Sequence, residues 1–261
     1  MLRIIAKIKN FSFDRIFFEE ENICLSDTEE LLFRSMADRY RRKEPVSKII
    51  NRRSFWKDDF FINADVLDPR PETELIVETV LSEFEPQSAL NFLDAGTGSG
   101  CILLSLLREY KNAQGVGIDF SSAAAEVAER NRKELNIENA IFIAADWNNF
   151  NGLPGREEMF DVIVSNPPYV KTEDIPLLDE SVRNYDPPAA LDGGKTGTEA
   201  YVSLSLLARR LLKPNGSVFW EIGYGQAAEV LGILRDNGFE PYKTVKDLAG
   251  TERVIAAHIV A

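Results

Sequence analysis

From residue 89 to the C-terminus, short apolar runs alternate with longer helical segments, and this alternation constrains the fold more than any other feature. Apolar runs of this length between turn residues are typical of buried strands. Strands that alternate with helices pair in parallel, because each helix returns the chain to the same end of the sheet. The sequence therefore predicts an α/β domain around a parallel sheet. The expected strands are 89–94, 114–119, 140–144, 161–164 and 217–222, with two more near 240–245 and 253–259, and the expected helices are 101–109, 121–136, 199–212 and 226–237.

The strand at 161–164 is followed by Asn166-Pro167-Pro168-Tyr169, a motif with unusual stiffness. Each proline fixes its own φ and keeps the preceding residue out of the helical region, so Asn166 and Pro167 are both held extended. The side-chain oxygen of Asn166 and the carbonyl of Pro167 can then accept both hydrogens of a planar NH2 group, with the ring of Tyr169 beside them. Taken alone, the motif fits a stiff loop after a core strand equally well.

Three other expected strand ends carry residues suited to a nucleoside-like cofactor. The turn Gly96-Thr97-Gly98-Ser99-Gly100 lets the backbone approach a ligand closely, although it lacks the glycine spacing of the dinucleotide fingerprint. Asp119 can accept hydrogen bonds from ribose hydroxyls, and Trp147 offers a ring to a base. Ligands of open α/β sheets bind at the carboxyl ends of strands near the topological switch point. We therefore expect these residues and Asn166 to surround one site.

Residues 1–70 are predicted to form a small helical domain that ends in a β-hairpin and a linker, and residues 71–261 the larger domain. A helix capped by Ser26 or Asp27 should run to about Arg42, with Glu29 or Glu30 reaching back to the cap. Its expected inner face consists of Leu31, Leu32, Met36 and Tyr40. An amphipathic helix is expected over residues 1–10, a hairpin over 54–62, and a linker over 67–74 that opens a helix at Pro71.

Two further stretches indicate contact with a substrate or a partner. Residues 171–198 form a long connection rich in proline, aspartate and glycine, and such loops are usually functional. Residues 34–57 carry nine basic and only two acidic side chains. This basic stretch is either a solvated helical face or a docking surface for an acidic protein or RNA.

Composition weighs against several other classes of protein. The net charge of −12 argues against stable binding of nucleic acid, and no apolar segment is long enough to span a membrane. Cys24 and Cys101 lie far apart, which predicts a reducing compartment, the cytoplasm, and no disulfide framework. With His258 as the single histidine and no cysteine pair, no metal site is expected.

As a set, the motifs resemble those of the S-adenosylmethionine-dependent methyltransferases with a Rossmann-like class I fold, and specifically the peptide chain release factor N5-glutamine methyltransferases. The resemblance runs from about Pro45 to the C-terminus. It is carried by Pro69-Arg-Pro-Glu-Thr-Glu74, Asp94 to Gly100, Asn166 to Val170, Tyr185 to Gly194, Glu221-Ile-Gly223 with Gln226, and Lys246-Asp247-Leu248 with Arg253.

The resemblance implies an enzyme that methylates the side-chain amide nitrogen of the glutamine in a Gly-Gly-Gln motif of release factors. S-adenosylmethionine would contact Gly96, Thr97, Gly98, Ser99, Gly100, Asp119, Trp147 and Asn166. The glutamine would bind to Asn166, Pro167, Pro168 and Tyr169, with Asn166, Pro167 and Tyr169 as the catalytic group. A small helical domain would precede the catalytic one. Lys48, Asn51 and Asp68 depart from the residues usual in that family, at positions away from the cofactor and acceptor motifs.

Two other functions remain open at this point. An N6-adenine or N2-guanine methyltransferase could hold the exocyclic amine of a base with the same motif, but such enzymes generally need a basic surface to capture the base. A cofactor-binding module without catalytic activity is the second alternative, against which the intact Asn166 and Tyr169 argue.

Overall fold

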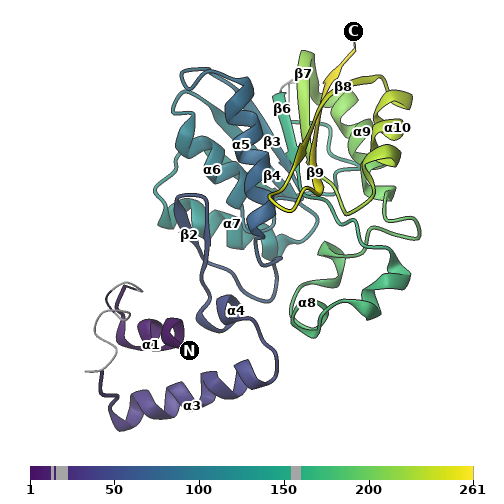
Figure 1. Ribbon diagram of the computed structural model, residues 1–261. Helices are drawn as coiled ribbons and strands as arrows, with labels where there is room; N and C mark the ends of the chain where they lie inside the picture. The colour runs from purple at the N-terminus through teal and green to yellow at the C-terminus, as the bar shows by residue number, and fades with distance from the viewer. Residues whose placement is uncertain (13–14, 16–22, 154–159, 261) are drawn as a thin grey trace.

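The computed structural model describes residues 1–12, 15, 23–153 and 160–260. In this part of the chain, a central seven-stranded sheet lies between two layers of helices (Figure 1). Its strands are β3 (Asn91–Ala95), β4 (Gln114–Asp119), β5 (Ala140–Ala144), β6 (Phe160–Ser165), β7 (Leu212–Glu221), β8 (Phe239–Lys246) and β9 (Glu252–Ile259). They lie in the order β5-β4-β3-β6-β7-β9-β8. Strands β3 to β7 are parallel, and β9 is antiparallel to both of its neighbours.

Successive residues of the central strands alternate between two hydrophobic cores, as the pleat of a strand requires. Phe92 and Val162 pack against α5 (Glu74–Glu83) and α6 (Cys101–Glu109), on the face that also carries α7 (Ser122–Glu134). Leu93 and Ile163 pack against α9 (Glu199–Leu211) and α10 (Ala227–Asp236). Burial on both faces explains why these strands read as continuous apolar runs.

The alternation of strands and helices predicted from the sequence is confirmed. The structure adds that β7 begins earlier than expected, at Leu212, and that the C-terminal pair makes the sheet mixed. The long connection at 171–198 contains η3 (Thr172–Leu177), α8 (Glu180–Arg183) and η4 (Pro188–Ala190). A single β-bridge between Val170 and Asp192 closes it into a compact loop.

The N-terminal region contains α1 (Leu2–Lys9), α3 (Asp27–Arg41) and α4 (Val46–Ile50), which lie apart from the sheet in Figure 1. The predicted capping box is present: Ser26 accepts a hydrogen bond from the backbone N–H of Glu29, whose carboxylate accepts one from the N–H of Ser26. The three helices share a small core built on Ile4, Ile49 and Ile50.

The predicted inner face of α3 is wrong at three of its four residues. Leu31, Leu32 and Tyr40 are 69%, 48% and 49% exposed. Met36 faces the other helices as predicted, but it does so together with Phe33 and Ala37. Their i, i+3, i+4 spacing gives a narrow apolar stripe, which is all that a helix packed against two short neighbours can bury.

The hairpin of β1 (Arg53–Phe55) and β2 (Asp58–Phe60) packs on the same face of the sheet as α5 and α6. Phe55 and Phe60 lie in the same core as α5 and α6, and Ile62 and Val66 pack against α7. After it, η2 (Pro71–Thr73) opens α5, as proline in a first helical turn favours. The domain boundary at residue 70 stays a prediction. Within the predicted N-terminal domain, residues 13–14 and 16–22 lie outside the described residues.

Candidate active site

A cavity of about 410 Å³ lies at the carboxyl ends of β3, β4 and β6, where the strand order reverses. This volume lies within the range of about 300–1,000 Å³ that is usual for small-molecule sites. The predicted residues that line it are Gly96, Thr97, Gly98, Ser99, Asp119, Trp147, Asn166 and Pro168. Other walls of the cavity were not predicted as parts of a site, and they include Asp65 to Leu67, Pro69, Thr73, Phe120, Pro187, Ala189 and Ala190.

The glycine turn adopts backbone conformations that favour glycine at all three positions, with φ of 76° at Gly96, 53° at Gly98 and 78° at Gly100. A Cβ on Gly98 would meet no atom within 4 Å, so this glycine leaves open space for a ligand. A Cβ on Gly100 would lie 3.1 Å from both Ala128 and Phe142. Gly100 therefore allows α6 to pack against its neighbours and does not line the cavity.

Asp119 is held in place by two backbone N–H groups. Its carboxylate accepts hydrogen bonds from Gly98 and from Ser121, each at 2.9 Å. Burial raises the pKa of Asp119 above its usual value. Since a carboxylate has about four acceptor positions, two remain for the hydroxyls of a ribose.

Two aromatic rings border the same cavity. The indole of Trp147 covers the glycine turn, because a Cβ on Gly96 would lie 3.2 Å from it. Phe120 is 82% exposed although it follows a buried strand. An apolar ring left exposed beside Asp119 gives a flat heterocycle a second surface on which to stack. The aromatic residue directly after the acidic strand end was the signal for it in the sequence.

The acceptor motif is fixed from several elements. The side-chain nitrogen of Asn166 donates to Thr73 Oγ1 at 3.1 Å, and both residues line the cavity. Pro168 lines it too, whereas Pro167 is buried and the side chain of Tyr169 packs away from it. The Tyr169 carbonyl accepts a hydrogen bond from the side chain of Gln226 at 2.9 Å.

The buried carboxylate of Glu221 lies next to Thr73, the hydrogen-bond partner of Asn166. It accepts hydrogen bonds from the hydroxyls of Thr73 at 2.6 Å and Tyr169 at 3.2 Å. Burial raises the pKa of Glu221 to about 7. Burial also raises the pKa of Tyr169, beside this carboxylate, so the phenol keeps its proton and acts as a donor.

In sequence, this chain is similar to known methyltransferases. Residues 86–239 match a family model described as "Methyltransferase domain". A release factor glutamine methyltransferase of Agrobacterium fabrum is 37% identical over 97% of this chain and 87% of its own length. The one from Rhodospirillum rubrum is 44% identical over 84% of this chain and 66% of its own. The chain belongs to the release factor glutamine methyltransferase family.

A solved structure supports the fold of this family member. The crystal structure of a methyltransferase from Pyrococcus furiosus matches with a TM-score of 0.55 at 20% identity, over 85% of this chain and 98% of that one. The family match confirms the resemblance inferred from the motifs, and this structural match confirms the Rossmann-like class I fold. Across the described residues, no helix is long and apolar enough to cross a membrane, and no group of three or more His, Cys, Asp and Glu side chains could hold a metal ion.

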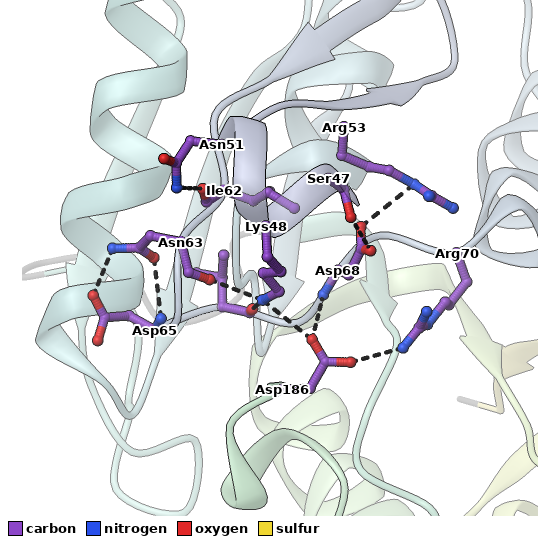
Figure 2. Close-up of polar contacts among 11 residues, drawn as sticks. Ser47, Lys48, Asn51, Arg53, Ile62, Asn63, Asp65, Asp68, Arg70 and Asp186 are labelled. Atoms are coloured by element: carbon purple, nitrogen blue, oxygen red, sulfur yellow. Dashed lines mark hydrogen bonds and ion pairs between the residues drawn. The ribbon is translucent and has the colours of Figure 1, made fainter. Parts of the chain in front are cut away.

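Lys48 and Asp68, two of the residues expected to depart from the family's pattern, lie in one buried ion cluster (Figure 2). The Lys48 ammonium lies 3.1 Å from Asp186 Oδ1 and also donates to the carbonyls of Asn63, at 2.8 Å, and Val66. Burial lowers the pKa of Lys48. Asp186 also accepts from the backbone N–H of Asp68 at 3.0 Å.

Further contacts extend this cluster around the cavity wall. Arg70 pairs with Asp186 at 2.7 Å, and Asp68 accepts a hydrogen bond from Ser47 at 2.5 Å (Figure 2). Asn51, with φ of 54°, adopts the left-handed conformation that asparagine tolerates, and its side chain donates to the Ile62 carbonyl. The cluster therefore joins α4 to the linker and to the 171–198 loop. The linker and the loop both line the cavity.

Several basic side chains of the stretch 34–57 are paired with carboxylates, so the stretch presents less unpaired positive charge than its sequence indicates. Arg41 pairs with Asp38 at 2.5 Å, Arg52 with Glu134 at 2.7 Å, and Arg53 with Asp68 at 3.4 Å. These contacts favour the interpretation as a structural surface. They weaken the case for a docking surface.

Proposed function

We propose that this chain transfers a methyl group from S-adenosylmethionine to the side-chain amide nitrogen of the glutamine in the Gly-Gly-Gln motif of peptide chain release factors. The observation that carries the proposal is the fixed position of Asn166 at the wall of the cavity. Its nitrogen is bonded to Thr73, which leaves its oxygen to accept a hydrogen bond from an incoming NH2 group. Membership of the release factor glutamine methyltransferase family supports the choice of substrate.

The cavity fits the methyl donor. Gly98 leaves room for a ligand at the glycine turn, Asp119 offers acceptors to ribose hydroxyls, and Trp147 offers a ring to adenine. When bound, S-adenosylmethionine supplies an electrophilic methyl group on a positively charged sulfur. Thr97 and Ser99 line the same wall, while Gly100 supports it from behind through its packing on α7.

Positioning carries most of the rate in this mechanism. An amide nitrogen is a poor nucleophile, because its lone pair is delocalised into the carbonyl. Asn166 Oδ1 and the Pro167 carbonyl accept the two amide hydrogens and so aim the nitrogen at the methyl group. Well-oriented reactants can gain about 7–11 kcal/mol over free ones. Pro168 and Tyr169 keep this motif rigid.

The surroundings support a protein substrate over a nucleic acid. Residues 61–261 hold most of the negative charge of the chain, which disfavours capture of a base from RNA or DNA. The family match also gives the adenine or guanine alternative no support. We place the protein in the cytoplasm, the reducing compartment that its two widely separated cysteines predict.

The test replaces Asn166 with alanine and with aspartate. Asn166→Ala removes one acceptor and leaves both prolines, so the protein should stay folded while methyl transfer falls by at least about 100-fold. Asn166→Asp keeps an acceptor of similar size and should retain more activity than Asn166→Ala. Mass spectrometry of a release factor incubated with S-adenosylmethionine reads out one added methyl group on the glutamine, with ribosomal RNA and DNA as parallel substrates. Methylation of RNA or DNA but not of the release factor would overturn the proposal.

A further inference from the structure

We infer that Thr73 and Glu221 are positioning residues that determine which end of the Asn166 side-chain amide faces the substrate. The inference rests on the proposed function and adds to it two residues outside the Asn-Pro-Pro-Tyr motif. An asparagine amide has a donor end and an acceptor end of nearly the same shape. The motif by itself does not decide which of them is turned toward the glutamine.

The decision is made by a short chain of hydrogen bonds. An ionised carboxylate can only accept, so the hydroxyl proton of Thr73 points to Glu221 Oε2, 2.6 Å away. Having donated its proton there, the Thr73 oxygen can only accept from Asn166, at 3.1 Å. The amide nitrogen of Asn166 is thereby tied to Thr73, and its oxygen is turned to the opposite side.

Glu221 is itself held by its neighbours. Its side chain is buried at the end of β7, and its second oxygen accepts a hydrogen bond from Tyr169 at 3.2 Å. Its backbone carbonyl accepts another from Tyr201 at 2.9 Å. The carboxylate therefore cannot turn away from Thr73, and in its ionised form it sets the order of donors and acceptors in the chain.

A reversed amide would be unproductive. It would present the NH2 group of Asn166 to the NH2 group of the glutamine, two donors facing each other with no acceptor between them. The glutamine nitrogen would then lose one of the two oxygens that aim it. Thr73 and Glu221 thus act on the geometry of the acceptor without contact to the reacting atoms.

The experiment compares Thr73→Val, which is close in shape but lacks the hydroxyl, with Thr73→Ser, which keeps it. Both are measured on the full-length enzyme with a release factor. Thr73→Val removes the hydroxyl bonded to both Glu221 and Asn166, and we expect it to lower kcat by about 10- to 100-fold because the Asn166 amide is no longer held. Thr73→Ser should restore most of it. Because Thr73 also lines the cavity, affinity for S-adenosylmethionine is measured by calorimetry in parallel, and a loss of positioning should lower kcat more than it weakens cofactor binding in Thr73→Val.

A second readout follows the Asn166 side chain directly. In the wild type, nitrogen-15 NMR should show one hydrogen of the Asn166 side-chain NH2 group protected from exchange by its bond to Thr73. This protection should disappear in Thr73→Val and persist in Thr73→Ser. A Thr73→Val enzyme that keeps both this protection and its kcat would overturn the inference. Absence of release-factor methylation in the wild type would instead overturn the proposed function.

Discussion

At Asp119, the backbone and the expected ligand share one carboxylate. Two of its acceptor positions already hold the backbone of Gly98 and Ser121. Asp119→Ala should therefore weaken S-adenosylmethionine binding by about 10- to 100-fold, since a hydrogen bond to a charged group contributes about 1.5–3 kcal/mol. Calorimetry measures the affinity. Asp119→Asn, which keeps one acceptor oxygen, is the matched control and should bind more tightly than the alanine variant. Unchanged affinity in a folded Asp119→Ala protein would remove Asp119 from the site.

The residues that sequence reasoning found are those whose chemistry is visible within one motif. Asn166 and Pro168 follow a recognisable strand, and Gly98 lies in a recognisable turn. Thr73 has no such signal, because its partner Asn166 is 93 residues away along the chain. The hydrogen bond from Tyr169 to Glu221 likewise spans 52 residues. Such pairs depend on the order of strands in the sheet.

Among the elements, α3 shows where periodicity is insufficient. Its ends were predictable, because the capping box of Ser26 and Glu29 is a local signal. Its buried face was not, because apolar residues on both sides of the helix offer two possible stripes. The short helix α4, which follows Pro45, was missed for a different reason: its five residues are too few for a helical period.

The ion cluster around Asp186 makes α4 and the 171–198 loop depend on each other. Lys48→Met removes a buried ammonium and leaves Asp186 with Arg70 and the Asp68 N–H. Breaking a buried pair costs about 3–5 kcal/mol. Because Asp186 keeps its other partners, we expect the free energy of unfolding to fall by about 3 kcal/mol. Denaturant unfolding measures it.

The control for Lys48 is Lys213, whose pair with Asp161 at 2.8 Å is partly exposed. Lys213→Met should cost less than about 1 kcal/mol. Because residues beside Asp68 and Asp186 line the cavity, Lys48→Met should also weaken cofactor binding, whereas Lys213→Met should not. Equal stability of the two variants would show that the cluster contributes no more than a surface ion pair.

For the molecule as a whole, the sequence predicted the order of elements well and the assembly between them poorly. The parallel strands follow from the alternation of apolar runs and helices. The packing of the hairpin against the α5–α6 core through Phe55 and Phe60 does not follow from the sequence, since no local pattern indicates which element the hairpin contacts. The same holds for the linker, which proved to be one wall of the cavity.

Two buried carboxyl groups should make stability and activity respond to pH in opposite directions. Burial raises the pKa of Asp94 and that of Glu221 to about 7. The charged group that faces Asp94 is Asp119. Glu221 is faced by Tyr169, Glu72 and Arg253, and the backbone carbonyl of Glu221 accepts a hydrogen bond from Tyr201. Both folded-state pKa values exceed the unfolded ones, so the folded state binds protons more tightly. The stability they contribute is complete below about pH 4 and is lost as the pH rises to about 7.

The melting temperature should therefore fall by at least about 5 °C between pH 5 and pH 8. Carboxylates with lowered pKa values, such as Glu29 and Glu199 at about 2, do not offset this loss, because their contribution changes only below about pH 4.5. Methyl transfer should rise over the same range, because Thr73 is oriented by the ionised form of Glu221. In Glu221→Gln, the rise in kcat with pH should vanish. In Asp94→Asn, the rise in kcat should remain, while the melting temperature should fall less with pH than in the wild type. Scanning calorimetry and initial rates across pH 5–8 measure both trends. A wild-type kcat that is flat across this range would show that the charge of Glu221 does not control the acceptor.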